Sequence, residues 1–236
     1  TVPSEIVIKQ AADLIAASKN PLIIAGAIGQ RPGVTKILGS LAERFALPVI
    51  QVGGPSLLSD HPMNLGFSVG EYLPDADLVL VLESAVPWIP RNVEPNKEAK
   101  LIHLSPDPHY SGLPYRGFEM DVAISGEPLQ SIELIEKALS SHKGLKSYMI
   151  KTRKAKITKA HNEHVTQKKK TMDRASIKMP ILSSWVAACL NKVKADDSII
   201  VSELGLNIDH VDYKVPGSIV SGAQAGGLGF GLGAAL

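Results

Sequence analysis

The residues Pro21-Leu-Ile-Ile-Ala-Gly26 decide the fold of this chain, because they form a short run that is apolar throughout. Strands of parallel sheets that are covered on both faces have this composition, whereas strands with one solvated face alternate between apolar and polar residues. A glycine-rich turn, G-A-I-G-Q-R-P-G, follows, and a helical pattern then extends from Val34 to Phe45. A second apolar run, Leu47–Gln51, completes the unit. The stretch therefore predicts a β-loop-α-β unit with a right-handed connection.

The alternation of apolar runs and helical patterns continues through residue 139. Two more buried strands are predicted at Asp77–Glu83 and Lys100–Ser105, and a short edge strand at Val122–Ser125. Short apolar strands between helices are typical of an α/β fold with a doubly wound, mostly parallel sheet, as in Rossmann-like domains. One helix is predicted to begin at the N-cap Ser4, with a single buried face made of Ile6, Ile8, Ala11, Ala12, Leu14 and Ile15. Another helix is predicted over Glu127–Leu139.

Ligands of such sheets bind beyond the carboxyl ends of the strands, at the point where the strand order reverses. The predicted lining of that crevice is Gly26–Gly33, Gln51–Pro55, Glu83–Pro90 and Ser105–Tyr110. Asp75 and Asp77 are expected to cap or flank the third strand.

A basic segment separates this first domain, residues 1–141, from the rest of the chain. Residues 142–178 hold ten Lys, two Arg, one Asp and one Glu, a net charge of +10 in a chain whose total is +2. We interpret residues 142–179 as a solvated helix or connector between domains. Nucleic-acid binding is the alternative, but only Tyr148 is available there for stacking on bases.

Residues 180–236 begin a second α/β domain. A helix is predicted over Ile181–Val193 and a buried strand over Asp197–Ser202, followed by G-L-N at 205–207. Val215–Val220 then leads to the glycine-rich run S-G-A-Q-A-G-G-L-G-F-G-L-G-A-A-L at 221–236. So short a segment cannot bury a complete doubly wound core. We therefore expect the chain, which starts without Met, to be a piece of a longer protein.

The composition excludes several classes of protein. A single cysteine, Cys189, rules out a disulfide framework and fits a cytoplasmic location, and we expect it to be a buried structural thiol. No signal peptide or membrane-spanning run is present. His61, His103 and His109 lack the spacing of a metal site, so structural or solvent-facing roles are expected for them.

Taken together, these motifs resemble thiamine-diphosphate-dependent enzymes of the acetolactate synthase, benzoylformate decarboxylase and pyruvate decarboxylase group. Residues 1–141 resemble the central domain of that family, and residues 180–236 resemble the first part of its diphosphate-binding domain. The matching segments are P-L-I-I-A-G at 21–26, D-H-P-M-N-L-G at 60–66, A-D-L-V-L-V-L at 76–82, I-H-L-S-P-D-P at 102–108, S-E-L-G-L-N at 202–207 and the glycine-rich run.

The resemblance implies roles for two groups of residues. Gly205, Leu206 and Asn207 would cradle the diphosphate of the cofactor. In the glycine-rich run, Gly226 would offer its carbonyl to the aminopyrimidine, and Leu228 its N–H. The Leu228 side chain would wedge between the two rings and hold the cofactor bent, with Gly227 and Gly229 leaving room on either side.

The resemblance also implies that essential parts lie outside this chain. The glutamate that activates the aminopyrimidine would precede Thr1, and the motif that binds Mg²⁺ would follow Leu236. Glu71 and Glu203 are not candidates for that glutamate. We therefore expect no catalytic residue and no metal ligand here, and no activity from this chain alone. The parent enzyme would be a homo-oligomeric 2-keto acid carboligase or decarboxylase, by default acetolactate-synthase-like, with no nucleic-acid or membrane partner.

The ligand of the first domain stays open. In relatives it is FAD, an adenine nucleotide or nothing. Many FAD-binding relatives carry Arg soon after the third strand and two carboxylates after the fourth. This sequence has Glu83-Ser-Ala-Val-Pro-Trp88, with Arg91 further on, and Ser105-Pro-Asp-Pro108. Trp88 is interpreted as a core or interface aromatic. The alternative functions are therefore nucleotide binding or a purely structural role in an oligomer.

Overall fold

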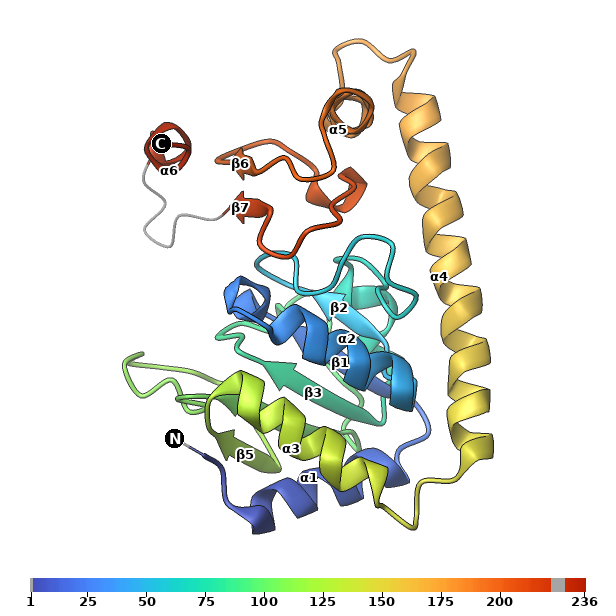
Figure 1. Ribbon diagram of the computed structural model, residues 1–236, viewed down its shortest axis with the longest axis vertical. Coiled ribbons are helices and arrows are strands. Elements are labelled where there is room, and N and C mark those ends of the chain that lie inside the picture. The colour runs from blue at the N-terminus through green and yellow to red at the C-terminus, as the bar shows by residue number, and fades with distance from the viewer. Residues whose placement is uncertain (1, 222–227) are drawn as a thin grey trace.

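A computed structural model describes residues 2–221 and 228–236, and it places a five-stranded parallel sheet in the first domain (Figure 1). The strand order is β2-β1-β3-β4-β5, so the direction of winding reverses between β1 and β3. The strands are β1 Pro21–Ala25, β2 Val49–Gln51, β3 Leu78–Leu82, β4 Lys100–Ser105 and β5 Val122–Ser125.

Burial on both faces explains why these strands were predicted from composition. Every residue of β1 and β3 is buried, and the two strands pair in parallel from Pro21 with Leu78 to Ala25 with Leu82. The short strands β2 and β5 lie at the two edges, as predicted for β5. The predicted parallel α/β sheet is confirmed.

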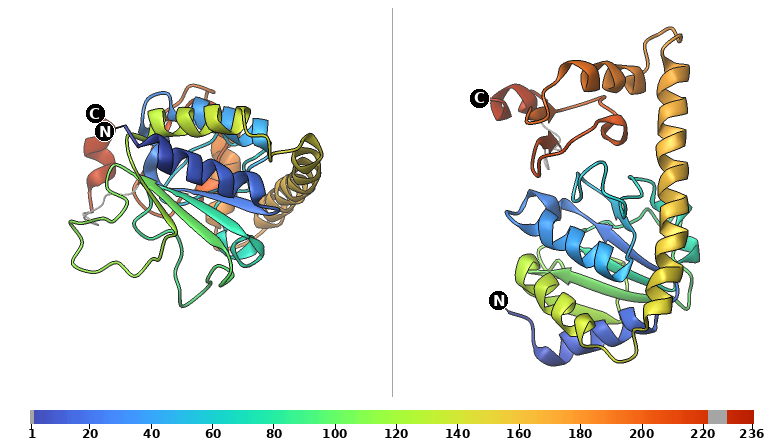
Figure 2. Two further views of the ribbon diagram at one scale, coloured as in Figure 1. Left: turned by 90° about the horizontal axis from the view of Figure 1, so that it is seen from below. Right: turned by 45° about the vertical axis from the view of Figure 1, so that its right-hand side comes forward.

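Three helices gather on one face of the sheet (Figure 2). They are α1 Glu5–Ala17, α2 Val34–Phe45 and α3 Pro128–Ser140, and α3 contacts both others. The remaining crossovers contain no α-helix; the short turns in the first domain are η1 Ala27–Gln30, η2 Val69–Glu71 and η3 Leu73–Asp75. Prolines within residues 55–74, 87–95 and 106–114 explain this, because proline interrupts the hydrogen bonds of a helix.

Helix α1 confirms one prediction and corrects another. Ser4 is its N-cap and accepts a hydrogen bond from the Val7 N–H at 3.4 Å. Ile6, which we placed on the buried face, is 79% exposed. The core-facing residues are Ile8, Ala11, Ala12 and Ile15. Ile6 lies outside that stripe, so its position near the helix start was not enough to bury it.

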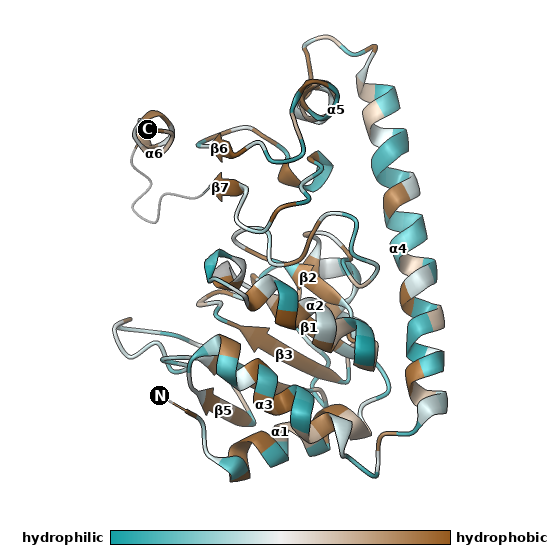
Figure 3. Ribbon diagram, in the orientation of Figure 1, coloured by the Kyte–Doolittle hydropathy of each residue, from teal (hydrophilic) through white to brown (hydrophobic). Residues whose placement is uncertain are grey.

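The basic segment forms one long helix, α4 Ser147–Ala175, which runs past the amino ends of the strands (Figure 1). Most of its surface is hydrophilic (Figure 3). It is nevertheless anchored, because Arg153 and Ile157 are buried against the first domain. The Arg153 guanidinium donates to the carbonyls of Ile15 at 3.0 Å and Phe45 at 3.4 Å, and to that of Ser18.

Asp77, just before β3, binds the same end of α1 that Arg153 contacts. Its carboxylate accepts hydrogen bonds from the Ser18 hydroxyl and from the N–H groups of Lys19 and Asn20. Asp77 therefore flanks the start of β3 as predicted, and it ties the end of α1 to the sheet.

The second part of the chain is small. It comprises α5 Ser183–Val193, β6 Ile200–Ser202, η4 Ile208–His210, β7 Ile219–Ser221 and α6 Phe230–Ala234. Strands β6 and β7 pair in parallel, and the buried cluster beneath them is Ala187, Val211, Tyr213 and Ile219.

Two predictions about this part are wrong. Strand β6 is only half-buried at Ile200 and Val201, because the sheet has just two strands and little packs on it. Cys189 is exposed rather than buried. The inward face of α5 consists of Ser184, Ala187 and Ala188, and Cys189 points away from it.

Tyr213 joins the second part to the first domain. Its hydroxyl accepts a hydrogen bond from the buried Gln51 amide at 3.1 Å, and its backbone pairs with Ser59. The other end of the Gln51 amide accepts hydrogen bonds from the N–H groups of Ser56 and Leu57. Burial raises the pKa of Tyr213 to about 12, so the phenol stays neutral and the joint does not titrate at physiological pH. No helix among the described residues is long and apolar enough to cross a membrane.

The anchor at Arg153 can be tested by Arg153→Met. The substitution leaves three backbone carbonyls without their charged donor, so we expect it to lower the free energy of unfolding by about 2 kcal/mol. Urea unfolding of the variant measures this loss. Lys151→Met, on an exposed position of the same helix, is the control and should unfold like the wild type. Equal midpoints for all three proteins would show that Arg153 is not an anchor.

Candidate functional site

The predicted cofactor residues lie on loops that follow β6 and β7. Because the two strands are parallel neighbours with Ser202 opposite Ser221, both loops leave the same edge of the small sheet. Gly205, Leu206 and Asn207 follow β6, and Leu228 and Gly229 precede α6. Gly226 and Gly227 lie outside the described residues.

The local geometry of the first loop suits a close backbone approach. Gly205 has a φ of 79°, and a methyl group at its Cα would meet no atom within 4 Å. Leu206 packs with the small buried cluster, and Asn207 forms the N-cap position of η4. The loop therefore exposes glycine backbone while its neighbours hold it to the core.

Leu228 is the one bulky side chain among the described residues of the second loop, just before α6, and it is 81% exposed. Gly229 follows with a φ of 92° and open space around its Cα. An exposed leucine beside the open backbone of Gly229 offers one apolar contact next to an accessible backbone group. The residues present thus fit an aromatic cofactor held by backbone groups and one apolar contact.

Sequence reasoning missed the residue that connects the two loops. The Glu203 carboxylate accepts hydrogen bonds from the Gly229 N–H and, at 2.9 Å, from the Gly231 N–H. These backbone N–H groups, Gly231 first, hold the pKa of the Glu203 carboxyl below its ordinary value. Glu203 therefore fixes the start of α6 beside the loop after β6. The signal in the sequence was an acidic residue directly after a strand, which we had only excluded as a catalytic group.

The crevice at the carboxyl edge of the first domain is bridged by the protein itself. The Gly26 N–H donates to Leu82 O at 2.7 Å, and a Cβ at Gly26 would lie 2.1 Å from the Glu83 carbonyl oxygen. Above this contact Arg31 donates to both carboxylate oxygens of Glu83, at 2.6 and 2.7 Å. An internal ion pair thus spans the point where the strand order reverses.

A second arginine reaches the loop after β3 from a distant segment. Arg116 donates to the carbonyls of Ser84 and Ala85 at 3.3 and 3.2 Å, and its guanidinium lies over the rings of Tyr110 and Phe118. Sequence reasoning sought an arginine immediately after the strand and did not consider one in a later loop.

The aromatic and histidine predictions concern the same region. Trp88 is buried and packs edge-on against Phe118, with ring centroids 5.1 Å apart, which agrees with a core aromatic. His103 is buried in β4; burial and the nearby Arg116 lower its pKa to about 4. The neutral Nδ1 accepts from Arg116 at 2.9 Å. His103, His61 and His109 join no group of three or more potential metal ligands in the part of the chain that the structure describes.

Comparison with known proteins identifies relatives. The model of the family described as thiamine pyrophosphate enzyme, central domain, matches residues 8–135. Among solved structures, a protein from Mycobacterium smegmatis that is described as a thiamin diphosphate-dependent enzyme superposes on this chain with a TM-score of 0.71 and 20% sequence identity. The superposition covers 99% of this chain and 44% of that one. Benzoylformate decarboxylase from Polynucleobacter necessarius gives a TM-score of 0.69 at 19% identity, over 100% and 43%.

These likenesses to solved structures show the fold alone, because the identities are low. The chain spans less than half the length of both structures.

The Glu203 bridge predicts a pH dependence. Because the pKa of the folded carboxyl lies below its ordinary value of 4.5, the bridge is fully formed above that pH and is lost as the pH falls through the lower, folded pKa. We expect the amide proton shifts of Gly229 and Gly231 to move together in an acid titration followed by NMR. Glu203→Gln should abolish this titration, and shifts that titrate unchanged in the variant would contradict the bridge.

Proposed function

The chain belongs to the thiamine pyrophosphate enzyme family, and we propose that its second part supplies backbone and apolar contacts for thiamine diphosphate in a larger enzyme. We further propose that the enzyme decarboxylates or joins 2-keto acids, with acetolactate-synthase-like condensation of pyruvate as the default reaction. The observation that carries the cofactor proposal is the placement of Gly205–Asn207 and Leu228 on two loops at one edge of parallel strands.

Each of these residues has a distinct task. The backbone N–H groups of Gly205–Asn207 would bind the diphosphate oxygens, as backbone N–H groups at turns bind anions elsewhere. Leu228 would lie between the two rings and keep them bent toward each other. Glu203 would hold Leu228 and Gly229 in position without contacting the reacting atoms. When bound, thiamine diphosphate would stabilise the carbanion that a 2-keto acid leaves after it loses CO₂.

The catalytic residues and the Mg²⁺ ligands are proposed to lie outside this chain. Glu203 is engaged by backbone N–H groups, and Glu71 lies on η2 in the other domain. The described residues offer no group of three or more potential metal ligands. We therefore propose that the chain alone is inactive and gains activity only as part of the complete enzyme.

FAD gains no support from the first domain, since the Arg31–Glu83 pair spans the crevice where a dinucleotide would lie. We favour a domain that acts as a scaffold. We propose that the enzyme is cytoplasmic and self-associates. The self-association is supported by large apolar side chains exposed on the second part, among them Ile181, Val193 and Leu204. Such side chains are typical of surfaces that are covered in an assembly.

Calorimetry on the full-length protein that contains this chain tests the proposal, with thiamine diphosphate titrated in the presence of Mg²⁺. We expect saturable binding, and binding at least about tenfold weaker in Leu228→Asp, because the apolar contact of a leucine is replaced by a charge. Ile6→Asp, at a similarly exposed position on α1 of the first domain, is the control and should bind normally. The absence of binding, or wild-type affinity in Leu228→Asp, would refute the assigned site.

A further inference from the structure

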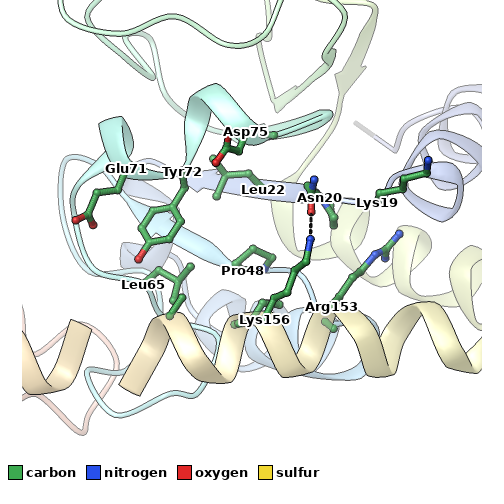
Figure 4. Close-up of a pocket in the computed structure, with 15 residues that line it drawn as sticks. Lys19, Asn20, Leu22, Pro48, Leu65, Glu71, Tyr72, Asp75, Arg153 and Lys156 are labelled. Carbon is green, nitrogen blue, oxygen red and sulfur yellow. Dashed lines mark hydrogen bonds between the residues drawn. The ribbon is translucent and has the colours of Figure 1, made fainter. Parts of the chain in front are cut away.

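A cleft of about 370 Å³ opens at the amino edge of the central sheet, on the opposite side from the crevice bridged by Arg31 and Glu83 (Figure 4). It lies between the start of β1, the residue before β2, the η2–η3 segment and the anchored half of α4. Its volume is within the range of small-molecule sites in proteins. None of its lining residues belongs to the proposed thiamine site.

The floor of the cleft is apolar and formed by buried side chains. Leu22, Leu65 and Ile157 are each at most 5% exposed, and Pro48 lies beside them. These residues come from β1, from the loop after β2 and from α4, so the floor forms only when α4 is in place. An apolar floor of this kind accommodates a short hydrocarbon segment.

Three cations converge at one end of the cleft. Arg153 is 4% exposed, and its guanidinium donates to three backbone carbonyls, with the Asp77 carboxylate near enough to favour its charge but not hydrogen-bonded to it. The Nε atom of Arg153 has no hydrogen-bond partner among the described residues. Lys19 lies nearby, and the Lys156 Nζ donates to Asn20 Oδ1 at 3.0 Å (Figure 4). No described residue forms a salt bridge with these cations.

The η2–η3 segment places negative charges on the remainder of the rim. Glu71 and Tyr72 lie at the far end from Lys19 and Arg153, and Asp75 lies above the floor (Figure 4). Neither carboxylate takes part in a salt bridge with a described residue. The cleft is therefore dipolar, with two lysines at one end and two carboxylates on the rest of the rim that form no salt bridge with a described residue.

We propose that this cleft binds a small dipolar molecule in which a carboxylate and an ammonium group are separated by a short hydrocarbon chain. The carboxylate lies toward Lys19, Lys156 and Arg153, where it gains the two lysines that form no salt bridge with a described residue. The ammonium group lies toward Glu71 and Asp75, and the hydrocarbon chain covers Leu22 and Pro48. Both charges of such a ligand gain a partner, whereas a simple carboxylate or a simple amine gains only one.

Three probes of equal carbon count separate these contributions. We expect 6-aminohexanoate to bind saturably to the full chain in a titration followed by NMR, and hexanoate and hexylamine each to bind about fivefold more weakly or worse, because each loses one set of rim charges. The titration contains no thiamine diphosphate, so its result is independent of the proposed cofactor site. No saturable binding of 6-aminohexanoate, or equal binding of all three probes, would overturn the proposal.

Two variants locate the binding, and both change exposed side chains. Lys156→Met should weaken 6-aminohexanoate about fivefold and leave hexylamine unchanged, while Glu71→Gln should weaken 6-aminohexanoate and leave hexanoate unchanged. Lys151→Met, on the same helix but outside the cleft, should bind like the wild type. Unchanged affinity in both variants would place the binding elsewhere and refute this site.

Discussion

One interaction, between the Arg153 guanidinium and three backbone carbonyls, fixes a solvated helix against the central sheet. Helix α4 is polar over most of its surface, so hydrophobic burial alone gives it little reason to stay on the domain. Arg153 supplies the missing hold by donating to carbonyls at the ends of α1 and α2. Terminal carbonyls of helices lack partners within the helix, so one guanidinium satisfies two helix ends and fixes the third helix to them.

At the carboxyl edge of the sheet, too, polar groups of the protein bind one another. Gly26 lets β1 and the residue after β3 approach so closely that no side chain fits between them, and the Arg31–Glu83 pair covers the contact. The place where this fold usually holds a ligand is therefore occupied by the protein's own charges. The proposed cofactor chemistry is accordingly assigned to the second part, and the first domain provides a support for it.

The strands of the first domain could be predicted because burial on both faces leaves an apolar run with no other interpretation. The cap at Ser4 and the flanking role of Asp77 followed from local chemistry in the same way. Ile6 and Cys189 were predicted to be buried and are exposed. Both lie on helices whose buried face is set by partners distant in the sequence. Arg116 and Arg153 act across long sequence separations, so no local pattern marked them.

The candidate site was predictable only in part, for a related reason. A family motif marks the residues after β6 and β7, but it does not reveal that Glu203 bridges them. That contact depends on the parallel pairing of β6 with β7, which brings together residues that lie far apart in the chain. Gly226 and Gly227 stay predictions, because they lie outside the described residues.

Helix α4 also braces the two parts of the chain against each other. The segment from Arg153 to Ala175 is about 33 Å long at the helical rise per residue. On the side of the first domain, His161 Nδ1 donates to the Asn64 carbonyl at 2.8 Å, beyond the contacts of Arg153. On the side of the second part, Lys168 donates to Asp212 at 3.1 Å. One continuous helix thus carries contacts to both parts, and the two parts cannot separate without breaking contacts on it.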